Sequence, residues 1–195
     1  MENPSNYASQ YFATLARVAG GIAVTDAAQR TISLDAGIAR FVDWCRTAAA
    51  AGSKLMFVGN GGSASIASHM AVDFSKNGRI KALAFNDPMF LTCLGNDLGF
   101  ENVFAFQIET HAEPGDLLVA VSSSGRSANI HKAVAAARER RARVVSLSGF
   151  DDVNPLRALG DLNFYVPAAE YGYVELLHCS LCHCVLDALM GVKTD

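Results

Sequence analysis

Two pairs of residues with acid–base or metal-binding side chains lie far apart in the sequence. His69 and Asp73 are four positions apart, whereas Glu175 and His183 are eight positions apart. On a helix, residues four apart share a face, so the first pair would bring an imidazole next to a carboxylate. Such a pair can transfer a proton or hold a divalent metal ion, and a local hydrogen bond on a surface helix explains it equally well. The spacing alone leaves these interpretations open.

The second pair lies in the long apolar run 174–190, which also carries His178 and a Cys-x-x-Cys segment. Glu175 and His178 share one helical face, whereas the two cysteines of that segment and His183 share another. Glu175 and His183 would be two helical turns apart, about 12 Å along the axis, so one ion would need long side chains to meet both. The cysteines lack a second pair and are expected to pack as small apolar residues. Whether His178 or His183 is the functional histidine stays open.

A glycine-rich turn follows the apolar run 54–58 and precedes the helical segment that carries His69 and Asp73. The turn consists of Asn60, Gly61, Gly62 and Ser63. Glycines let backbone N–H groups approach a ligand, and the first turn of a helix favours an anion. The turn matches neither the dinucleotide fingerprint nor the P-loop pattern, and a serine helix cap alone would also explain it.

A second turn of this kind follows the apolar run 116–121. It has four serines within six positions, which is more than one helix cap needs: Ser122, Ser123, Ser124 and Ser127. Ligands of parallel α/β sheets bind at the carboxyl ends of the strands, where both turns are expected to lie. The two turns together predict a phosphate or other anion site.

Strand-like and helical runs alternate from residue 54 onward. Strands are expected at 54–58, 81–85, 117–121, 143–147 and 162–166, with helices between them and a last helix over 174–190. This alternation predicts an α/β fold with a parallel sheet and helices on both faces. Asp87 before Pro88 predicts a helix start. The segment Gly95-Asn96-Asp97 is interpreted as a turn, in which Asp97 is a turn residue or a ligand of a sugar hydroxyl.

Two amphipathic helices are expected between residues 7 and 50, interrupted around Gly20-Gly21 and Thr25-Asp26. They have little sheet of their own to cover, which favours packing against another subunit. The Arg-rich stretch 138–143 is interpreted as the solvated end of a helix, because it is too short for a nucleic-acid footprint.

The composition favours one globular domain of 195 residues, with 51% hydrophobic and 18% charged residues and a net charge of −3. No apolar run reaches the roughly 18 residues of a membrane span. The N-terminus lacks the pattern of a signal peptide. Five cysteines without a small-scaffold pattern indicate the reduced cytoplasm.

Five segments together resemble the sugar isomerase (SIS) domain family, and within it the bacterial phosphoheptose isomerases. They are 59–63, 95–100, 114–118, 122–129 and 147–151. The resemblance implies a flavodoxin-like three-layer α/β/α sandwich, formed by a single SIS domain over residues 1–195. Within that domain, it implies N-terminal helices for oligomerisation in 1–50 and a phosphosugar-binding core in 51–195. A homotetramer with active sites at subunit contacts is implied as well.

The resemblance also implies conversion of sedoheptulose 7-phosphate to D-glycero-D-manno-heptose 7-phosphate, for the heptose of surface polysaccharides. The implied phosphate ligands are Ser63, Ser122, Ser124 and Ser127, with Ser123 where the family often has Thr. The remaining expected substrate-binding residues are Asn60, Gly61, Gly62, Asn96 and Asp97. The implied zinc ligands are His69, Asp73, Glu175 and His183.

The chain departs from the family pattern at three positions. Asp73 stands where the family usually has Glu, Glu175 where it has Gln, and Gly172 where an Asp is frequent. The expected reaction moves a proton between C1 and C2 of an open-chain ketose through a cis-enediol. Asp73 or Glu175 is the expected base, and His183 moves a proton at oxygen. An isomerase of another ketose phosphate and a non-catalytic SIS sensor or assembly protein are the alternatives.

Overall fold

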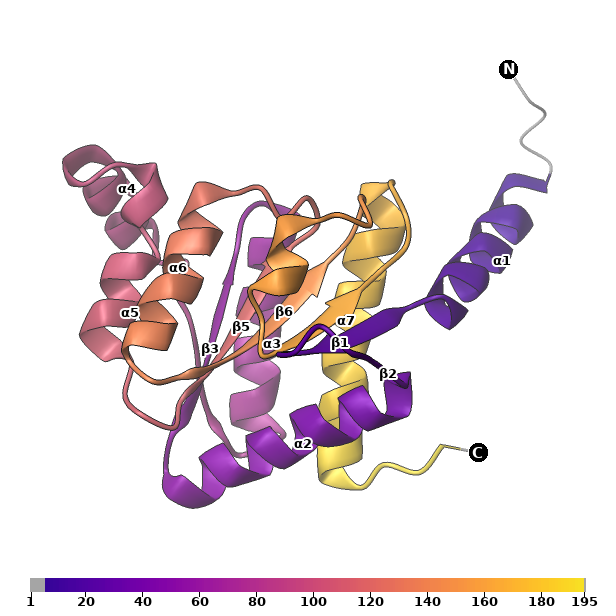
Figure 1. Ribbon diagram of the computed structural model, residues 1–195, viewed down its shortest axis with the longest axis horizontal. Helices are drawn as coiled ribbons and strands as arrows, with labels where there is room; N and C mark the ends of the chain where they lie inside the picture. The colour runs from indigo at the N-terminus through magenta and orange to yellow at the C-terminus, as the bar shows by residue number, and fades with distance from the viewer. Residues whose placement is uncertain (1–5, 195) are drawn as a thin grey trace.

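The computed structural model describes residues 6–194 and contains a seven-stranded sheet with helices on both faces (Figure 1). The strands are β1 (Ala23–Asp26), β2 (Thr31–Ile32), β3 (Lys54–Gly59), β4 (Lys81–Ala84), β5 (Leu117–Ser122), β6 (Arg143–Ser148) and β7 (Leu162–Tyr165). The α-helices are α1 (Tyr7–Gly20), α2 (Leu34–Ala51), α3 (Gly62–Lys76), α4 (Pro88–Asp97), α5 (Ala105–His111), α6 (Ala128–Glu139) and α7 (Tyr171–Met190). Two 3₁₀ turns are η2 (Phe100–Asn102) and η3 (Pro155–Ala158).

Five parallel strands form the centre of the sheet, in the order β4-β3-β5-β6-β7. This is the order of flavodoxin-like folds, so the predicted fold class is confirmed. Every residue of β5 and β7 is buried, as expected for strands covered on both faces. The carboxyl ends of β3 and β5 are neighbours in register, with Gly59 opposite Val121. The two turns that follow these strands therefore start side by side.

A hairpin that the sequence patterns did not predict, β1–β2, lies beside β7 at one edge of the sheet. β1 pairs antiparallel with β7 and with β2, and thereby extends the sheet beyond the parallel strands. The interruption expected around Thr25-Asp26 is thus a strand and its turn. Asp26 shapes this turn, because its carboxylate accepts hydrogen bonds from the backbone N–H groups of Ala28 and Arg30.

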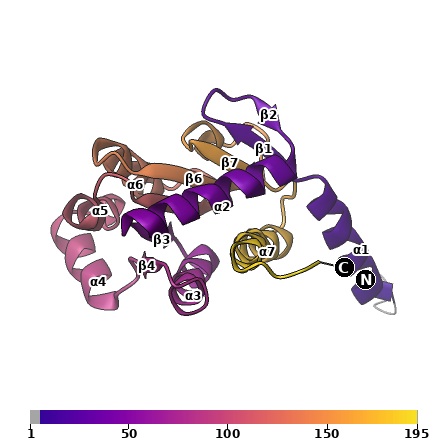
Figure 2. The same cartoon turned by 90° about the horizontal axis from the view of Figure 1, so that it is seen from below.

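Helices α2, α3 and α7 cover one face of the sheet, and α5 and α6 cover the other (Figure 2). The expectation that both N-terminal helices lack sheet to cover is wrong for α2. Phe41, Val42 and Cys45 of α2 are buried against the sheet and α7. In contrast, α1 extends away from the body and exposes Tyr7 and Phe12 (Figure 1).

Helix starts follow the expected chemistry at α4. The Asp87 carboxylate accepts hydrogen bonds from the N–H groups of Met89 and Phe90, and Pro88 occupies the first helical position. The turn predicted at 95–97 is wrong, because α4 continues through Asp97. An N-cap and a proline at the start stabilise this helix enough to include Gly95-Asn96-Asp97.

Helix α7 is the one helix within residues 6–194 that is long and apolar enough to cross a membrane by length and composition. Seven of its residues are buried, and it packs against α2, α3 and the sheet. Its apolar character therefore serves the core of this domain. It also places its polar residues next to α3.

Candidate active site

A cavity of about 230 Å³ opens at the carboxyl ends of β3 and β5. The turn Asn60–Ser63, here called the first loop, forms one side, and the turn Ser122–Ser127, here called the serine loop, forms another. Tyr171 and Glu175 of α7 complete the lining. The residues predicted from the two loops are Asn60, Gly61, Gly62, Ser63, Ser122, Ser123, Ser124 and Ser127, and all of them line this cavity.

Two helix starts are directed at the cavity. Gly61, which precedes α3, has φ +56°, a conformation that glycine adopts without strain. Within the described residues, no side chain caps the first turn of α3 or of α6. Of the two roles left open for Ser63, a helix cap or an anion contact, the structure shows no cap among the residues it describes, and Ser63 is buried at the cavity wall. Uncapped helix starts leave N–H groups that favour an anionic ligand.

A pair of amides joins the two loops. The Nδ2 atom of Asn60 donates to Oδ1 of Asn129 over 2.9 Å, and Nδ2 of Asn129 donates back to Oδ1 of Asn60 over 2.9 Å. Asn129 is buried in the first turn of α6. The pair fixes the distance between the first loop and the serine loop before any ligand binds.

The serine loop is held by hydrogen bonds within the loop and by the side chain of Asn154. Ser122 Oγ accepts a hydrogen bond from the N–H of Gly125, and Ser124 Oγ accepts one from the N–H of Arg126. Gly125 has φ +62°, and a Cβ there would overlap the side chain of Asn154. The same Asn154 donates to the carbonyl of Ser123 over 2.9 Å. The hydroxyl of Ser123 is buried and has no partner among residues 6–194, which leaves it available to a ligand after a side-chain rotation.

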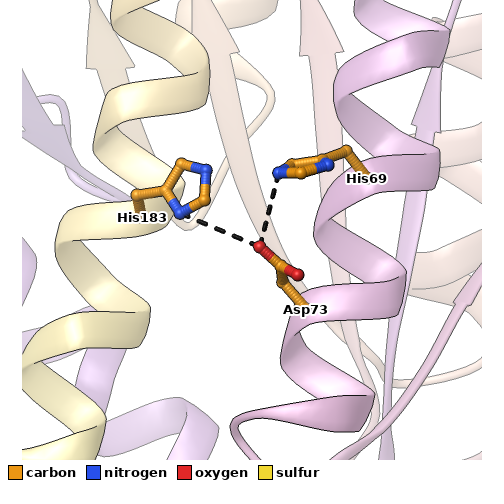
Figure 3. A group of neighbouring side chains, drawn as sticks. All are labelled: His69, Asp73 and His183. Atoms are coloured by element: carbon orange, nitrogen blue, oxygen red, sulfur yellow. Dashed lines mark ion pairs between the residues drawn. The ribbon is translucent and has the colours of Figure 1, made fainter.

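Two helical turns further along α3 and α7, a second group of polar side chains comes together (Figure 3). His69 Nε2 lies 3.3 Å from Oδ2 of Asp73, and His183 Nδ1 lies 3.9 Å from the same oxygen. The two imidazole rings are 5.3 Å apart and tilted by 62°. The side chains of His69, Asp73 and His183 are 55%, 19% and 40% exposed, so the group is open to solvent and to a substrate.

The donor atoms of these three residues fit a metal ion. One ligand atom of each lies within 4.8 Å of the others. Two imidazoles and a carboxylate are a ligand set of catalytic zinc sites, which keep a further position for water or substrate. His69 would coordinate through Nε2 and His183 through Nδ1, the atoms that face Asp73.

The structure places Glu175 apart from this group. Its carboxylate packs against Gly62 so closely that a Cβ at Gly62 would overlap it. Glu175 thus lines the cavity between the two loops, and it is not one of the three residues that could share an ion. The 12 Å helical spacing expected from the sequence explains this separation.

The two histidines of α7 differ in surroundings. His178 is fully buried, and its Nε2–H donates to the carbonyl of Ser148 over 3.0 Å. Burial lowers the pKa of His178 to about 4, against the opposite effect of this hydrogen bond, so the ring is neutral at pH 7. His183 is the histidine of α7 that meets Asp73.

The cysteines of α7 form no metal site within the described residues. Cys182 is buried in the core, as expected, and burial raises the pKa of its thiol. Cys179 is partly buried, and burial together with the Asp73 charge raises the pKa of its thiol.

Asn96 and Asp97 are not brought to the cavity. They lie exposed near the end of α4, where Asn96 Nδ2 donates to Oδ1 of Asp97 over 2.8 Å. Three residues of the site were not predicted from the sequence, namely Asn129, Asn154 and Tyr171. Asn129 lay inside a recognised segment, but its partner Asn60 is 69 positions away, so only the fold reveals the pair.

The arrangement defines an α/β sandwich protein with a polar, hydroxyl-rich cavity at the carboxyl edge of its parallel strands. The SIS domain family matches residues 16–149 of the chain. A phosphoheptose isomerase of Geobacter sulfurreducens is 34% identical over 178 residues, which cover 88% of this chain and 93% of that relative. One of Rhodospirillum rubrum is 38% identical over 149 residues, or 71% and 79% of the two chains.

Solved structures agree with these relatives. The phosphoheptose isomerase of Neisseria gonorrhoeae superposes with a TM-score of 0.83 at 30% identity, covering 96% of this chain and 99% of that one. That of Francisella tularensis gives a TM-score of 0.83 at 25% identity, covering 98% and 100%. The chain belongs to the SIS domain family, and its similarity to phosphoheptose isomerases extends over nearly its whole length.

Proposed function

We propose that the protein is an aldose–ketose isomerase that converts sedoheptulose 7-phosphate to D-glycero-D-manno-heptose 7-phosphate. One observation carries this proposal: the hydroxyl-rich cavity and the His69/Asp73/His183 group lie along the same two helices, α3 and α7. The phosphate would bind at the cavity, and the carbons that react would lie at the imidazoles and the carboxylate. The similar phosphoheptose isomerases support the choice of a seven-carbon substrate.

The distance between the two ends supports a long open-chain sugar. Gly62 and His69 are seven residues apart on α3, which corresponds to about 10 Å along the axis. Six carbon–carbon bonds separate C1 from the phosphate-bearing carbon of an open-chain heptulose 7-phosphate, and an extended chain of that length spans such a distance. A triose phosphate is too short to reach from one end to the other.

Asp73 is the proposed base. In the ketose, its carboxylate removes the proton from C1 while the carbonyl oxygen on C2 receives a proton, which gives the cis-enediol. Return of a proton to C2 and loss of the proton from the oxygen on C1 then gives the aldose. Asp73 is favoured over Glu175 because it contacts both imidazoles, whereas Glu175 lies at the phosphate end. His183 moves the proton at oxygen, since its ring is half-exposed beside Asp73.

We further propose that His69, Asp73 and His183 hold a zinc ion. When bound, zinc supplies a positive charge that polarises a carbonyl and stabilises negative charge on its oxygen. His69 then serves chiefly as a ligand. Elemental analysis of protein purified without chelator tests this, with His183→Ala for comparison. Stoichiometric zinc in the wild type and its loss in the variant support the site, whereas a metal-free wild type that is fully active in EDTA refutes it.

A non-catalytic sugar-phosphate sensor is the rival from another class. Such a protein needs the two loops but has no use for an acid–base group at a fixed distance from them. Incubation of the purified protein with sedoheptulose 7-phosphate, followed by NMR of the product, separates the two functions. Appearance of the aldose, and its absence with Asp73→Asn, supports the enzyme. Binding without conversion supports the sensor.

We also propose a cytoplasmic homotetramer, without nucleic-acid or membrane partners. The exposed Tyr7 and Phe12 of α1 support an assembly role for that helix. Asn96 and Asp97, exposed on α4, would then act in the site of a neighbouring subunit. Removal of residues 1–50 would also uncover the sheet under α2, so Phe12→Ser is the sharper variant. An unchanged mass by light scattering in that variant argues against the role of α1. The five free thiols support a reducing compartment.

A further inference from the structure

A second cavity, of about 220 Å³, lies at the amino ends of β5 and β6, whereas the serine loop follows the carboxyl end of β5. Leu117 opens β5 and Arg143 opens β6, whereas Ser122 and Ser148 end these strands. The cavity is lined by the start of β5 and β6, by the turn at Arg141 and by Trp44 of α2. It is thus separated from the proposed active site by the length of the strands.

The Arg-rich stretch 138–143 contributes to this cavity in an uneven way. Arg138 and Arg140 direct their guanidinium groups to the carbonyls of Leu159 and Glu109. Arg141 and Arg143 instead line the cavity, and neither forms an ion pair with a carboxylate among the described residues. Both arginines are exposed residues, and their unpaired positive charges would attract an anion that binds in the cavity.

The surroundings of the two arginines make the cavity positive. Its one carboxylate, Asp116, is fully buried and already neutralised, since Lys54 Nζ lies 2.7 Å away. The backbone N–H groups of Lys54 and Glu113 also donate to it. The guanidinium carbon of Arg143 lies 5.2 Å from the centre of the Trp44 ring, which holds one cation in place. The lining therefore offers two unpaired positive charges, one of them packed on Trp44, beside a small cavity.

We propose that this cavity is a second anion site, which binds a phosphate group between Arg141 and Arg143. Guanidinium groups donate paired hydrogen bonds that match phosphate oxygens. The phosphate is either inorganic phosphate or a small phosphomonoester, because the volume admits few further atoms. This site is independent of the proposed isomerisation, because it shares no lining residue with the cavity between the first loop and the serine loop.

Trp44 makes the proposal directly measurable, because it is the one tryptophan of the chain. Inorganic phosphate is titrated into the wild-type protein at constant ionic strength, and tryptophan emission is followed. We expect a saturable change in emission. In Arg141→Gln the Kd for phosphate should rise about tenfold or more, because a hydrogen bond to a charged group is lost. A parallel titration with glycerol 3-phosphate separates the two sources: saturation with either supports the site.

Three controls make the result specific. Chloride at equal ionic strength should give no saturable change. Arg138→Gln removes a guanidinium that lies outside the cavity and should leave the Kd unchanged, as should Ser124→Ala in the serine loop. Arg141→Lys, which keeps the charge, should give an intermediate Kd. No saturable change in the wild type, an unchanged Kd in Arg141→Gln, or loss of the signal in Ser124→Ala overturns the proposal.

Discussion

The two ends of the α3–α7 pair are built in different ways. The end proposed to bind phosphate, here called the phosphate end, consists of loops whose backbone is fixed by Asn60, Asn129 and Asn154, with buried serines between them. The other end consists of three side chains on helix surfaces, of which His69 and His183 are 55% and 40% exposed. Rigid loops suit a phosphate group, which does not change during the reaction. Mobile side chains suit the carbon and oxygen atoms between which protons move. We therefore expect substitutions at the two ends to affect different kinetic constants.

The largest effect is expected from Asp73→Asn. If Asp73 is the base, kcat should fall by about 10²- to 10⁴-fold with little change in KM, since the amide cannot accept the proton. Steady-state kinetics with sedoheptulose 7-phosphate measures both constants. Asp187→Asn, at an exposed position of the neighbouring helix α7, is the control and should keep its kcat. A kcat of Asp73→Asn within a few-fold of wild type would transfer the role of base to another group.

The two histidines of α7 extend the comparison to stability. Because the pKa of His178 is about 4 in the folded protein and about 6.5 when unfolded, the unfolded state binds an extra proton between these pH values. The free energy of unfolding should therefore fall by about 3 kcal/mol as the pH drops from about 6.5 to about 4. Denaturant unfolding across this range should show a shallower fall in His178→Gln. His111→Gln, at an exposed histidine, should keep the wild-type slope, and equal slopes in all three proteins would contradict the assignment.

At the phosphate end, Ser124→Ala should raise KM about tenfold, the loss of a hydrogen bond to a charged group, and lower kcat less. Phosphate binding is shared by ground and transition states, so the rate of conversion at saturation suffers little. Ser180→Ala, which removes an exposed hydroxyl of α7, is the control. If KM stays constant in Ser63→Ala, Ser122→Ala and Ser124→Ala, the phosphate binds elsewhere.

The smallest effect is expected for Glu175→Gln. This variant best distinguishes the role of the phosphate end from that of the His69/Asp73/His183 group. The carboxylate lines the cavity proposed for the phosphate, so its removal should lower KM by about fivefold through reduced like-charge repulsion. The variant should keep most of its kcat and all of its zinc. A fall in kcat as large as that of Asp73→Asn would instead make Glu175 the base, and loss of zinc would make it a ligand.

Local patterns predicted the elements that depend on local physics. Four of the five parallel strands, β3, β5, β6 and β7, are apolar runs that are almost entirely buried, whereas β4 at the edge is partly exposed. Helix α4 begins where Asp87 and Pro88 predict it. The β1–β2 hairpin was missed because short edge strands gain their stability from pairing with β7, which is distant in sequence. The end of α4 was missed because Gly95 and Asn96 are weak helix formers, and the cap and packing override that weakness.

The candidate site shows the same division. His69 and Asp73 share a helix, so their contact follows from spacing alone. The contact of His183 with Asp73 depends on how α7 packs on α3, and sequence could supply it only through a family resemblance. For Glu175 the helical rise gave the better guide, since it predicted a separation from His183 that the structure has.

The reciprocal amide pair has a consequence for the chemical ageing of the protein. Asn60 precedes Gly61, and an asparagine before glycine readily loses ammonia when the next backbone nitrogen attacks its side chain. Both polar atoms of the Asn60 amide are engaged by Asn129, which holds the side chain away from that attack. Deamidation would place a carboxylate opposite Oδ1 of Asn129 and at the wall of the cavity. We therefore expect the Asn60–Asn129 pair to slow deamidation of Asn60 as well as to join the two loops.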